Sequence, residues 1–266
     1  MTTQLDSDDI KGLVLGLALP SMVAQFVSVL YSIVDRMYIG NIAVIGETAL
    51  AGVGVCGPIL TMISAFASLI GIGGGPLVSI RLGQHREKDA EKVLSDCFMT
   101  LSAISVLVMA VSFLLKDRLL WWFGASEAVF PYADEYMSWY LSGTVFALLS
   151  TGMNQFIICQ GYSKTAMRSV LLGAALNIIL DPVFIFVLGM NVKGAALATV
   201  ISQFASCIYV LRFLFSGKSA LRIHIKRPEK KNILGVCKLG LTPFLIIAFD
   251  NVMLISLNAM ITKYGG

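Results

Sequence analysis

The sequence predicts an all-α, polytopic membrane protein, because of its composition and of seven long apolar stretches. Of its 266 residues, 57% are hydrophobic and only 14% are charged, and its mean hydropathy is +0.81. A soluble domain is roughly half apolar and about one quarter charged. Each apolar stretch holds about 20 residues or more, which is the length that a helix needs to cross the hydrocarbon core of a bilayer.

The seven predicted spans follow one another along the chain. Their approximate limits are 13–39, 49–80, 93–115, 136–160, 165–189, 194–215 and 235–261. The residues before the first span are polar and acidic rather than basic, so this segment is expected to stay in the protein and not to be a cleaved signal peptide. The second span is longer than one crossing and contains four glycines and a proline between Gly71 and Pro76. It is expected to bend or unwind there, or to let neighbouring helices approach closely.

The residues typical of enzymes and metal sites are sparse. The five cysteines are odd in number, widely spaced and mostly inside apolar stretches, so no disulfide framework and no metal site is expected. They are Cys56, Cys97, Cys159, Cys207 and Cys237. His85 and His224 fall in charged connecting segments and not among carboxylates or cysteines. The sequence therefore indicates no catalytic pair of a serine or cysteine with a histidine. An enzyme is therefore not expected, and no bound cofactor is expected either.

The distribution of lysine and arginine predicts a cytoplasmic N-terminus, since positively charged loops are retained on the cytoplasmic side. Fifteen of the twenty basic residues fall on the side of the N-terminus: Lys11, Arg81, Arg86, Lys88, Lys92, Lys164, Arg168, Arg212, Lys218, Arg222, Lys226, Arg227, Lys230, Lys231 and Lys238. The other side holds Arg36, Lys116, Arg118, Lys193 and Lys263. The run from Lys218 to Lys231 joins two spans and has no interleaved aromatic residues. It is expected to be a solvated linker, and a nucleic-acid partner is not expected.

Two similar segments indicate an internal repeat. Leu15–Pro20 (LGLALP) opens the first span and Leu239–Pro243 (LGLTP) opens the seventh, each after a lysine. Six spans separate them, so both enter the membrane in the same orientation, as in parallel repeats. The expected organisation is a six-helix lobe over 1–216, a cytoplasmic basic linker over 217–234 and the first helix of a second lobe over 235–266. A lone helix of a second lobe lacks partners for its polar groups, so the chain is expected to be a piece of a longer protein.

Three carboxylates lie inside the predicted spans, namely Asp35, Asp181 and Asp250. An acid at the centre of a bilayer costs about 2.5–3.5 kcal/mol on insertion scales, so each one points to a function. Asn177 lies four residues before Asp181 and shares its helix face, which offers an amide oxygen and a carboxylate to a small cation. Pro182 cannot donate a backbone hydrogen bond and is expected to kink the helix beside the acid.

Depth and neighbours leave structural alternatives open. At 1.5 Å per residue, Asp35, Asp181 and Thr199 lie roughly 8, 14 and 9 Å inside the outer ends of their spans. An ion pair with the adjacent Arg36 is an equally good interpretation of Asp35, and Asp181 can instead make a hydrogen bond between helices. Thr199 by itself fits a role in the helix core. Gln25, Asn154 and Gln155 can line a polar cavity or bond between helices, and the role of Asp250 is open.

Several segments together resemble the MATE (multidrug and toxic compound extrusion) transporters, and specifically their DinF-like branch. The segments are Gly71–Gly83, Gln160–Met167, Asn177–Phe186, Lys193–Gln203, Asn258 and Tyr264–Gly266. Their order and spacing cover nearly the whole chain. Cys159 and Asp250 depart from the residues that relatives often carry at these places, which bears on substrate preference more than on the fold.

The resemblance implies the six-helix N-lobe of a 12-helix transporter, followed by the first helix of its C-lobe. Such proteins exchange H⁺ or Na⁺ for organic cations or other amphipathic drugs across the inner membrane, and transport requires both lobes. The N-lobe cation site of the DinF-like branch falls on Asp35, Asn177, Asp181 and Thr199. Two alternatives remain: a flippase for lipid-linked precursors from the same superfamily, which the near-absence of basic residues in the spans disfavours, and a non-transporting membrane scaffold.

Overall fold

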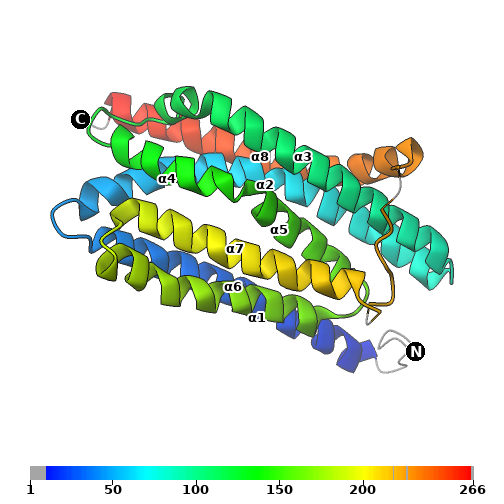
Figure 1. Cartoon of the computed structure of the whole chain (residues 1–266). Coiled ribbons are helices and arrows are strands. Elements are labelled where there is room, and N and C mark those ends of the chain that lie inside the picture. The colour runs from blue at the N-terminus through cyan, green and yellow to red at the C-terminus, as the bar shows by residue number, and fades with distance from the viewer. Residues whose placement is uncertain (1–9, 218, 226, 265–266) are drawn as a thin grey trace.

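The computed structural model describes residues 10–217, 219–225 and 227–264, which form long helices joined by short turns and one extended segment (Figure 1). The helices are α1 (Ile10–Gly40), α2 (Gly46–Gly83), α3 (Glu87–Trp122), α4 (Phe130–Ser142), α5 (Thr144–Cys159), α6 (Ser163–Pro182), the π-helix η2 (Val183–Val187), α7 (Asn191–Phe215) and α8 (Lys230–Tyr264). Within the described ranges six helices are long and apolar enough to cross a membrane, or seven if α4 and α5 form one span. The prediction of an all-α, multi-pass membrane protein is confirmed.

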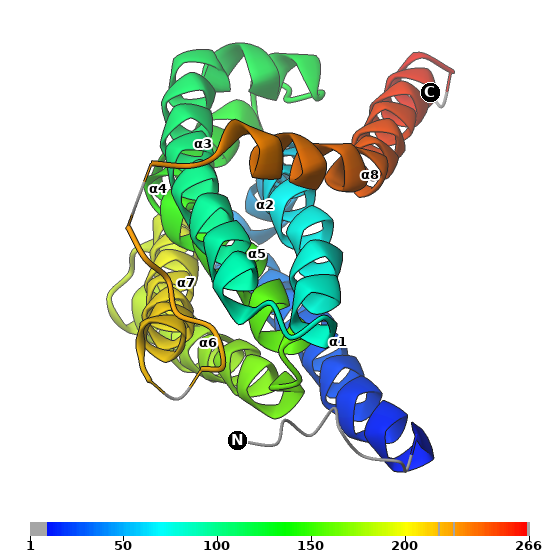
Figure 2. The same ribbon diagram turned by 90° about the vertical axis from the view of Figure 1, so that its right-hand side faces the viewer.

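The helices run side by side along one long direction, with the N-terminal end of α1 and the C-terminal end of α8 at opposite ends (Figures 1 and 2). α6 packs against α1 on one side and α7 on the other, whereas α2 packs against α3, α5 and α8. α5 also contacts α7, so it connects the two groups of helices. This arrangement leaves α1, α5, α6 and α7 around a common interior space.

The span predicted over 136–160 is not a single helix. α4 and α5 meet at Gly143 with a bend of 58° between them. At this point the chain touches α7 so closely that a Cβ atom on Gly143 would lie 2.6 Å from Cγ2 of Val200. The break thus occurs where a neighbouring helix occupies the space of a side chain, and this packing was not visible in the sequence.

The glycine cluster of α2 serves close packing and not unwinding. α2 is helical without interruption from Gly46 to Gly83, so the expected unwinding near Gly71 is wrong. A Cβ on Gly71 would lie 2.7 Å from the backbone oxygen of Gly152 on α5, and one on Gly73 would lie 2.8 Å from the backbone nitrogen of Gly240 on α8. The absence of side chains lets α2 approach α5 and α8 backbone to backbone, as small residues do in membrane helix pairs.

The segment between α7 and α8 is not a wholly solvated linker. Leu221 and Ile223 are buried, and Gln160 at the end of α5 accepts hydrogen bonds from Ser219 Oγ (2.8 Å) and from the backbone N–H of Leu221 (3.1 Å). The segment therefore lies against the helix ends, and α8 begins at Lys230, inside the range expected as linker. Positions 218, 226, 265 and 266 of the predicted linker and second-lobe helix lie outside the described residues.

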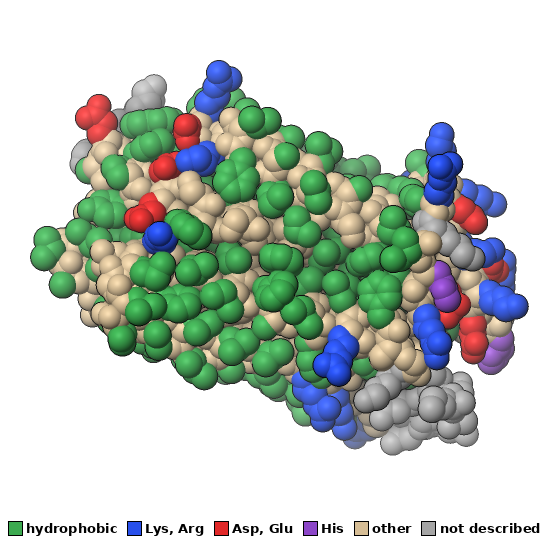
Figure 3. All heavy atoms as spheres, in the orientation of Figure 1, with side chains coloured by type: hydrophobic (Ala, Val, Ile, Leu, Met, Phe, Trp, Pro, Cys, Tyr) green, Lys and Arg blue, Asp and Glu red, His purple; other side chains and the backbone are tan. Residues whose placement is uncertain are grey.

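The surface separates apolar flanks from charged ends. Figure 3 shows hydrophobic side chains over the middle of the molecule, with most of the lysines, arginines and histidines gathered at the end where α1 starts. The turn between α2 and α3, which contains Arg86, and the first turn of α3, which contains Lys88, belong to this end. The molecule thus has the apolar middle surface and the unequal charge of its two ends that are typical of a helix bundle placed across a bilayer.

Candidate functional site

Three of the four predicted cation-site residues are joined directly by hydrogen bonds. Asn177 on α6 donates from Nδ2 to Oδ1 of Asp181 (3.2 Å) and to Oγ1 of Thr199 on α7 (3.3 Å). The Thr199 hydroxyl in turn donates to the backbone oxygen of Ala195 (3.0 Å). Asp181 is 0% exposed and Asn177 is 1% exposed, so the i, i+4 spacing read from the sequence places both side chains inside the bundle.

The fourth residue, Asp35, reaches the same place from α1. Its carboxyl group lies within hydrogen-bonding reach of the Asp181 carboxyl group, and it is buried. Arg36 is exposed, and among the ion pairs of the described residues none joins it to Asp35. The structure therefore favours the interpretation of Asp35 as part of a buried acid pair over that of a local ion pair with Arg36.

The cluster has three oxygen atoms without a partner. Oδ1 of Asp35, Oδ1 of Asn177 and Oδ2 of Asp181 are buried and accept no hydrogen bond within the described part of the chain. Two carboxylates this close repel each other unless a proton or a cation lies between them. Carboxylate, amide and hydroxyl oxygens are also the ligands that hard cations prefer. The arrangement can thus hold either a shared proton or a small cation.

Tyrosines border the acid pair, and sequence reasoning missed them. Tyr136 and Tyr140 of α4 stack on each other with ring centroids 5.9 Å apart, and both lie close enough to Asp35 to interact with its charge. The hydroxyl oxygen of Tyr140 accepts a hydrogen bond from Nε2 of Gln203 (2.8 Å). The i, i+4 spacing of the two tyrosines was a usable signal, but the break at Gly143 that orients α4 was not predictable.

The helix changes its type at Pro182, next to the acid, and the kink expected there stays a prediction. The α-helical part of α6 ends at Pro182, and the chain continues as the π-helix η2. In η2 the backbone N–H of Leu188 bonds to the oxygen of Val183 at 2.9 Å, five residues back. A π-turn of this kind is frequent at functional sites, and here it directly follows Asp181.

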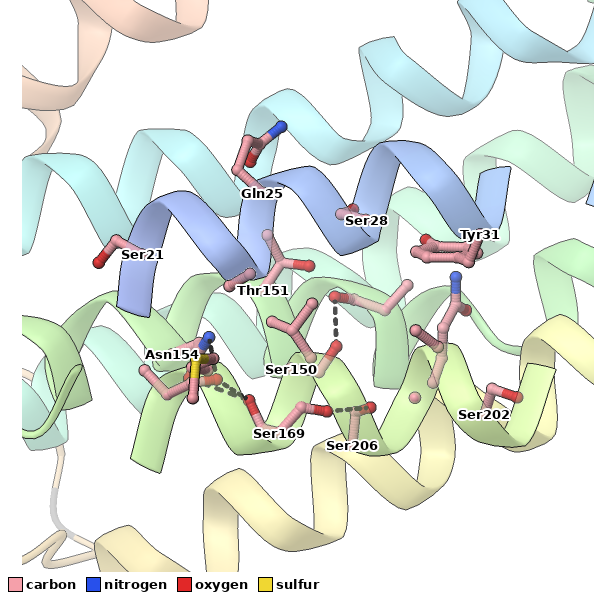
Figure 4. A pocket seen from close by; sticks show the side chains of 18 of the residues that line it. Ser21, Gln25, Ser28, Tyr31, Ser150, Thr151, Asn154, Ser169, Ser202 and Ser206 are labelled. Carbon is pink, nitrogen blue, oxygen red and sulfur yellow. Dashed lines mark hydrogen bonds between the residues drawn. The ribbon is translucent and has the colours of Figure 1, made fainter. Parts of the chain in front are cut away.

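A polar cavity of about 490 Å³ adjoins the cluster and is lined by residues of α1, α5, α6 and α7 (Figure 4). Gln25, Asn154 and Gln155 all line it, as do Asn177 and Thr199 of the cluster. Asp35 and Asp181 are not among the described lining residues, and Asn177, which donates a hydrogen bond to Asp181, connects the cavity with the cluster. Asn154 accepts a hydrogen bond from Ser169 Oγ (3.2 Å).

Asp250 is not brought to this site. It is exposed on α8, and none of the described cavity-lining residues belongs to α8. The described residues contain no group of three or more His, Cys, Asp or Glu side chains that is arranged to hold a metal ion. His224 is nevertheless closer to a carboxylate than expected, because its Nε2 lies 3.5 Å from Oε2 of Glu91.

A multi-pass helix bundle with a buried acid pair beside a polar cavity has the build of a membrane transporter. The family model described as MatE matches residues 20–183 of this chain. The chain belongs to the MatE family, which agrees with the resemblance found in its motifs.

Individual relatives agree with this assignment. The multidrug export protein MepA of Staphylococcus haemolyticus is 26% identical over 250 residues, which cover 93% of this chain and 55% of MepA. A solved structure titled as an outward-facing multidrug resistance MATE family transporter superposes with a TM-score of 0.88 at 26% identity, covering 99% of this chain and 59% of that one. A transporter from Pyrococcus furiosus, whose title states a reversed polarity of the binding pocket and suggests a different function, superposes with a TM-score of 0.89 at 25% identity, covering 99% of this chain and 58% of that one. The chain spans about half the length of the curated relatives that it matches.

Proposed function

We propose that this chain provides the cation-coupling part of an inner-membrane antiporter that exports drugs or organic cations in exchange for H⁺ or Na⁺. The observation that carries the proposal is the meeting of three unpartnered oxygens, on Asp35, Asn177 and Asp181, at one buried place. Membership of the MatE family and the similarity to the multidrug export protein MepA support export of drugs. The charged end of the bundle supports a cytoplasmic N-terminus.

The acid pair can couple ion binding to shape. When the site is empty, the carboxylates of Asp35 on α1 and Asp181 on α6 repel each other, which favours a larger separation of the two helices. A bound cation or proton removes this repulsion and favours the close arrangement. An ion shifts the equilibrium between the separated and the close arrangement only by its differential affinity for the two. Since the ion binds the close arrangement better, its binding moves α1 toward α6. This movement changes the cavity that both helices line.

The cavity lining gives little support to a flippase for phosphorylated lipid precursors. Recognition of a phosphate favours arginine or lysine, and no basic side chain is present among the described residues that line the cavity. We therefore keep export of drugs or organic cations as the proposed activity.

The test neutralises each acid in the complete reading frame that encodes this chain. Asp181→Asn and Asp35→Asn keep the size of the side chain but remove its charge, so ethidium efflux from everted vesicles with an imposed H⁺ or Na⁺ gradient should fall at least tenfold. Binding of the drug to purified protein should fall much less, because apolar contacts supply most of the affinity in a drug pocket. Asp117→Asn is the matched control, since the Asp117 side chain is exposed and its carboxylate lies 3.4 Å from Nζ of Lys116. Efflux at the wild-type rate from both buried variants would refute coupling at this pair.

A further inference from the structure

The first turns of α8 run across the bundle near its charged end, before the helix joins the direction of the others. Figures 1 and 2 show this part of α8 in orange, lying across α2, and the later part in red, running along the bundle. Asn232 fixes the first turns by its hydrogen bonds to Arg81 on α2 and Asp96 on α3. The start of α8 therefore has the orientation of a helix that lies in the plane of a membrane interface.

One face of these turns packs against the protein. Asn232, Val236 and Gly240 are buried and follow one another at steps of four residues, so they share this face. The packing is tight, because a Cβ on Gly73 of α2 would lie 2.8 Å from the backbone nitrogen of Gly240. The face that α8 turns away from α2 is thereby fixed as well.

The opposite face carries lysines and leucines in alternation. Lys231, Leu234, Lys238 and Leu241 follow one another at steps of three and four residues, and all four are exposed. Leu234 is 59% exposed and Leu241 is 50% exposed. The leucines favour contact with acyl chains, whereas a lysine lays its stem along apolar surface and extends its ammonium group to the polar side. This outward stripe, formed by the four residues, thus fits the boundary between hydrocarbon and headgroups.

The charge around the outward stripe is strongly positive. The sequence from Arg227 to Leu241 contains four basic residues and a single acid, Glu229. Within the described part of the chain no ion pair involves Lys230, Lys231 or Lys238, and basic side chains project from this end of the molecule (Figure 3). Lysines at a membrane surface attract anionic lipids, whereas a zwitterionic headgroup has no net charge to complement them.

We propose that the outward stripe of α8, with Lys230 beside it, binds anionic phospholipids of the leaflet at the charged end of the bundle. The headgroup phosphates contact the ammonium groups, and the acyl chains cover Leu234 and Leu241. Because Asn232 fixes the same turns to α2 and α3, a bound lipid stabilises the start of α8 on the side that the protein leaves open. The inference goes beyond the proposed function and does not depend on coupling at the acid pair.

The experiment measures which lipids the protein retains. The protein made from the complete reading frame is purified in detergent with equal amounts of phosphatidylglycerol and phosphatidylcholine, and native mass spectrometry gives the ratio of the two bound lipids. The wild type should retain phosphatidylglycerol in excess. In the triple variant Lys230→Gln, Lys231→Gln and Lys238→Gln this ratio should fall at least about fivefold, since each lysine adds to the attraction. The triple arginine variant at the same positions keeps the charge and should keep the ratio.

A matched control removes three lysines of the same end from other helices. Lys88→Gln, Lys92→Gln and Lys164→Gln together should leave the ratio unchanged, because all three residues are exposed and lie on α3 and α6. Leu234→Ser with Leu241→Ser should reduce the amount of both lipids retained. Glycerol 3-phosphate, a soluble analogue of the headgroup, should not displace phosphatidylglycerol from the wild type.

Three outcomes would overturn the lipid surface. One is an unchanged ratio in the triple glutamine variant of α8. Another is an equal fall in the control variant, which would assign the preference to total charge. The third is displacement of the lipid by glycerol 3-phosphate together with wild-type retention in the leucine variants, which would indicate a site for a soluble phosphate. Efflux by the Asp181→Asn protein tests the coupling role separately and leaves this inference unaffected.

Discussion

Asn232, near the start of α8, donates a hydrogen bond of 2.7 Å from Nδ2 to Oδ2 of the buried Asp96 on α3. Its Oδ1 accepts a bond of 2.9 Å from Nη2 of Arg81 on α2. The amide of Asn232 therefore bonds to a buried acid through its NH₂ group and to a base through its oxygen. These two bonds connect α8 to α3 and α2 at the charged end of the bundle.

This relationship predicts the stability of a variant. Asn232→Leu leaves Asp96 buried without its donor, which should cost about 1–3 kcal/mol and lower the unfolding temperature of the detergent-purified protein. Adding Asp96→Leu should restore part of the loss, since replacing both partners by apolar groups removes the unpaired acid. Asn41→Leu is the control, because Asn41 is exposed, directly follows α1 and donates only a local hydrogen bond to Met37 in the last turn of that helix. Equal unfolding temperatures for Asn232→Leu and Asn41→Leu would contradict the structural role of Asn232.

The glycine contacts of α2 predict a contrast between two alanine variants. Gly71→Ala places a methyl group against the backbone of Gly152, and overpacking of this kind costs about 1–3 kcal/mol. Gly54→Ala meets nothing within 4 Å and should be neutral or slightly stabilising in the helix. Thermal unfolding followed by tryptophan fluorescence compares the two. If Gly71→Ala is as stable as the wild type, the close approach of α2 and α5 is wrong.

The threonine of the cluster predicts an effect on ion affinity. Thr199→Val keeps the shape of the side chain but removes the hydroxyl that bonds to Asn177. The concentration of Na⁺ or H⁺ that supports half-maximal efflux should rise about tenfold, which corresponds to about 1.4 kcal/mol. Thr61→Val is the control, because Thr61 is exposed and bonds to Gly57 in its own helix. An unchanged ion dependence in Thr199→Val would remove Thr199 from the site.

The charge distribution predicts the orientation of the bundle. His85 lies in the turn between α2 and α3, and Glu127 lies in the turn between α3 and α4, at the opposite end. With the native cysteines replaced, His85→Cys should react with an impermeant maleimide only after the cells are opened, whereas Glu127→Cys should react in intact cells. The reverse pattern would show that the N-terminus is outside.

The parts of the site that follow from local spacing and depth were visible in the sequence. Asn177 and Asp181 share a face because they are four residues apart, and the similar depths of Asp35 and Thr199 indicated that they could meet them. The tyrosines of α4, the bend at Gly143 and the packing of Leu221 on the helix ends depend on how distant helices approach one another. Asp250 resembled the other acids in its apolar surroundings, and only the tertiary arrangement separates it from them.

The close backbone contact between Gly73 on α2 and Gly240 on α8 also fixes a distance that spectroscopy can use as a reference. A Cβ on Gly240 would overlap the backbone oxygen of Leu69, so α8 cannot slide along α2 without losing this fit. Spin labels on exposed positions of these two helices, such as Ile80 and Leu239, should therefore report one narrow distance under every ionic condition. A third spin label at the exposed Met22 on α1 then measures how far α1 moves relative to α2 and α8.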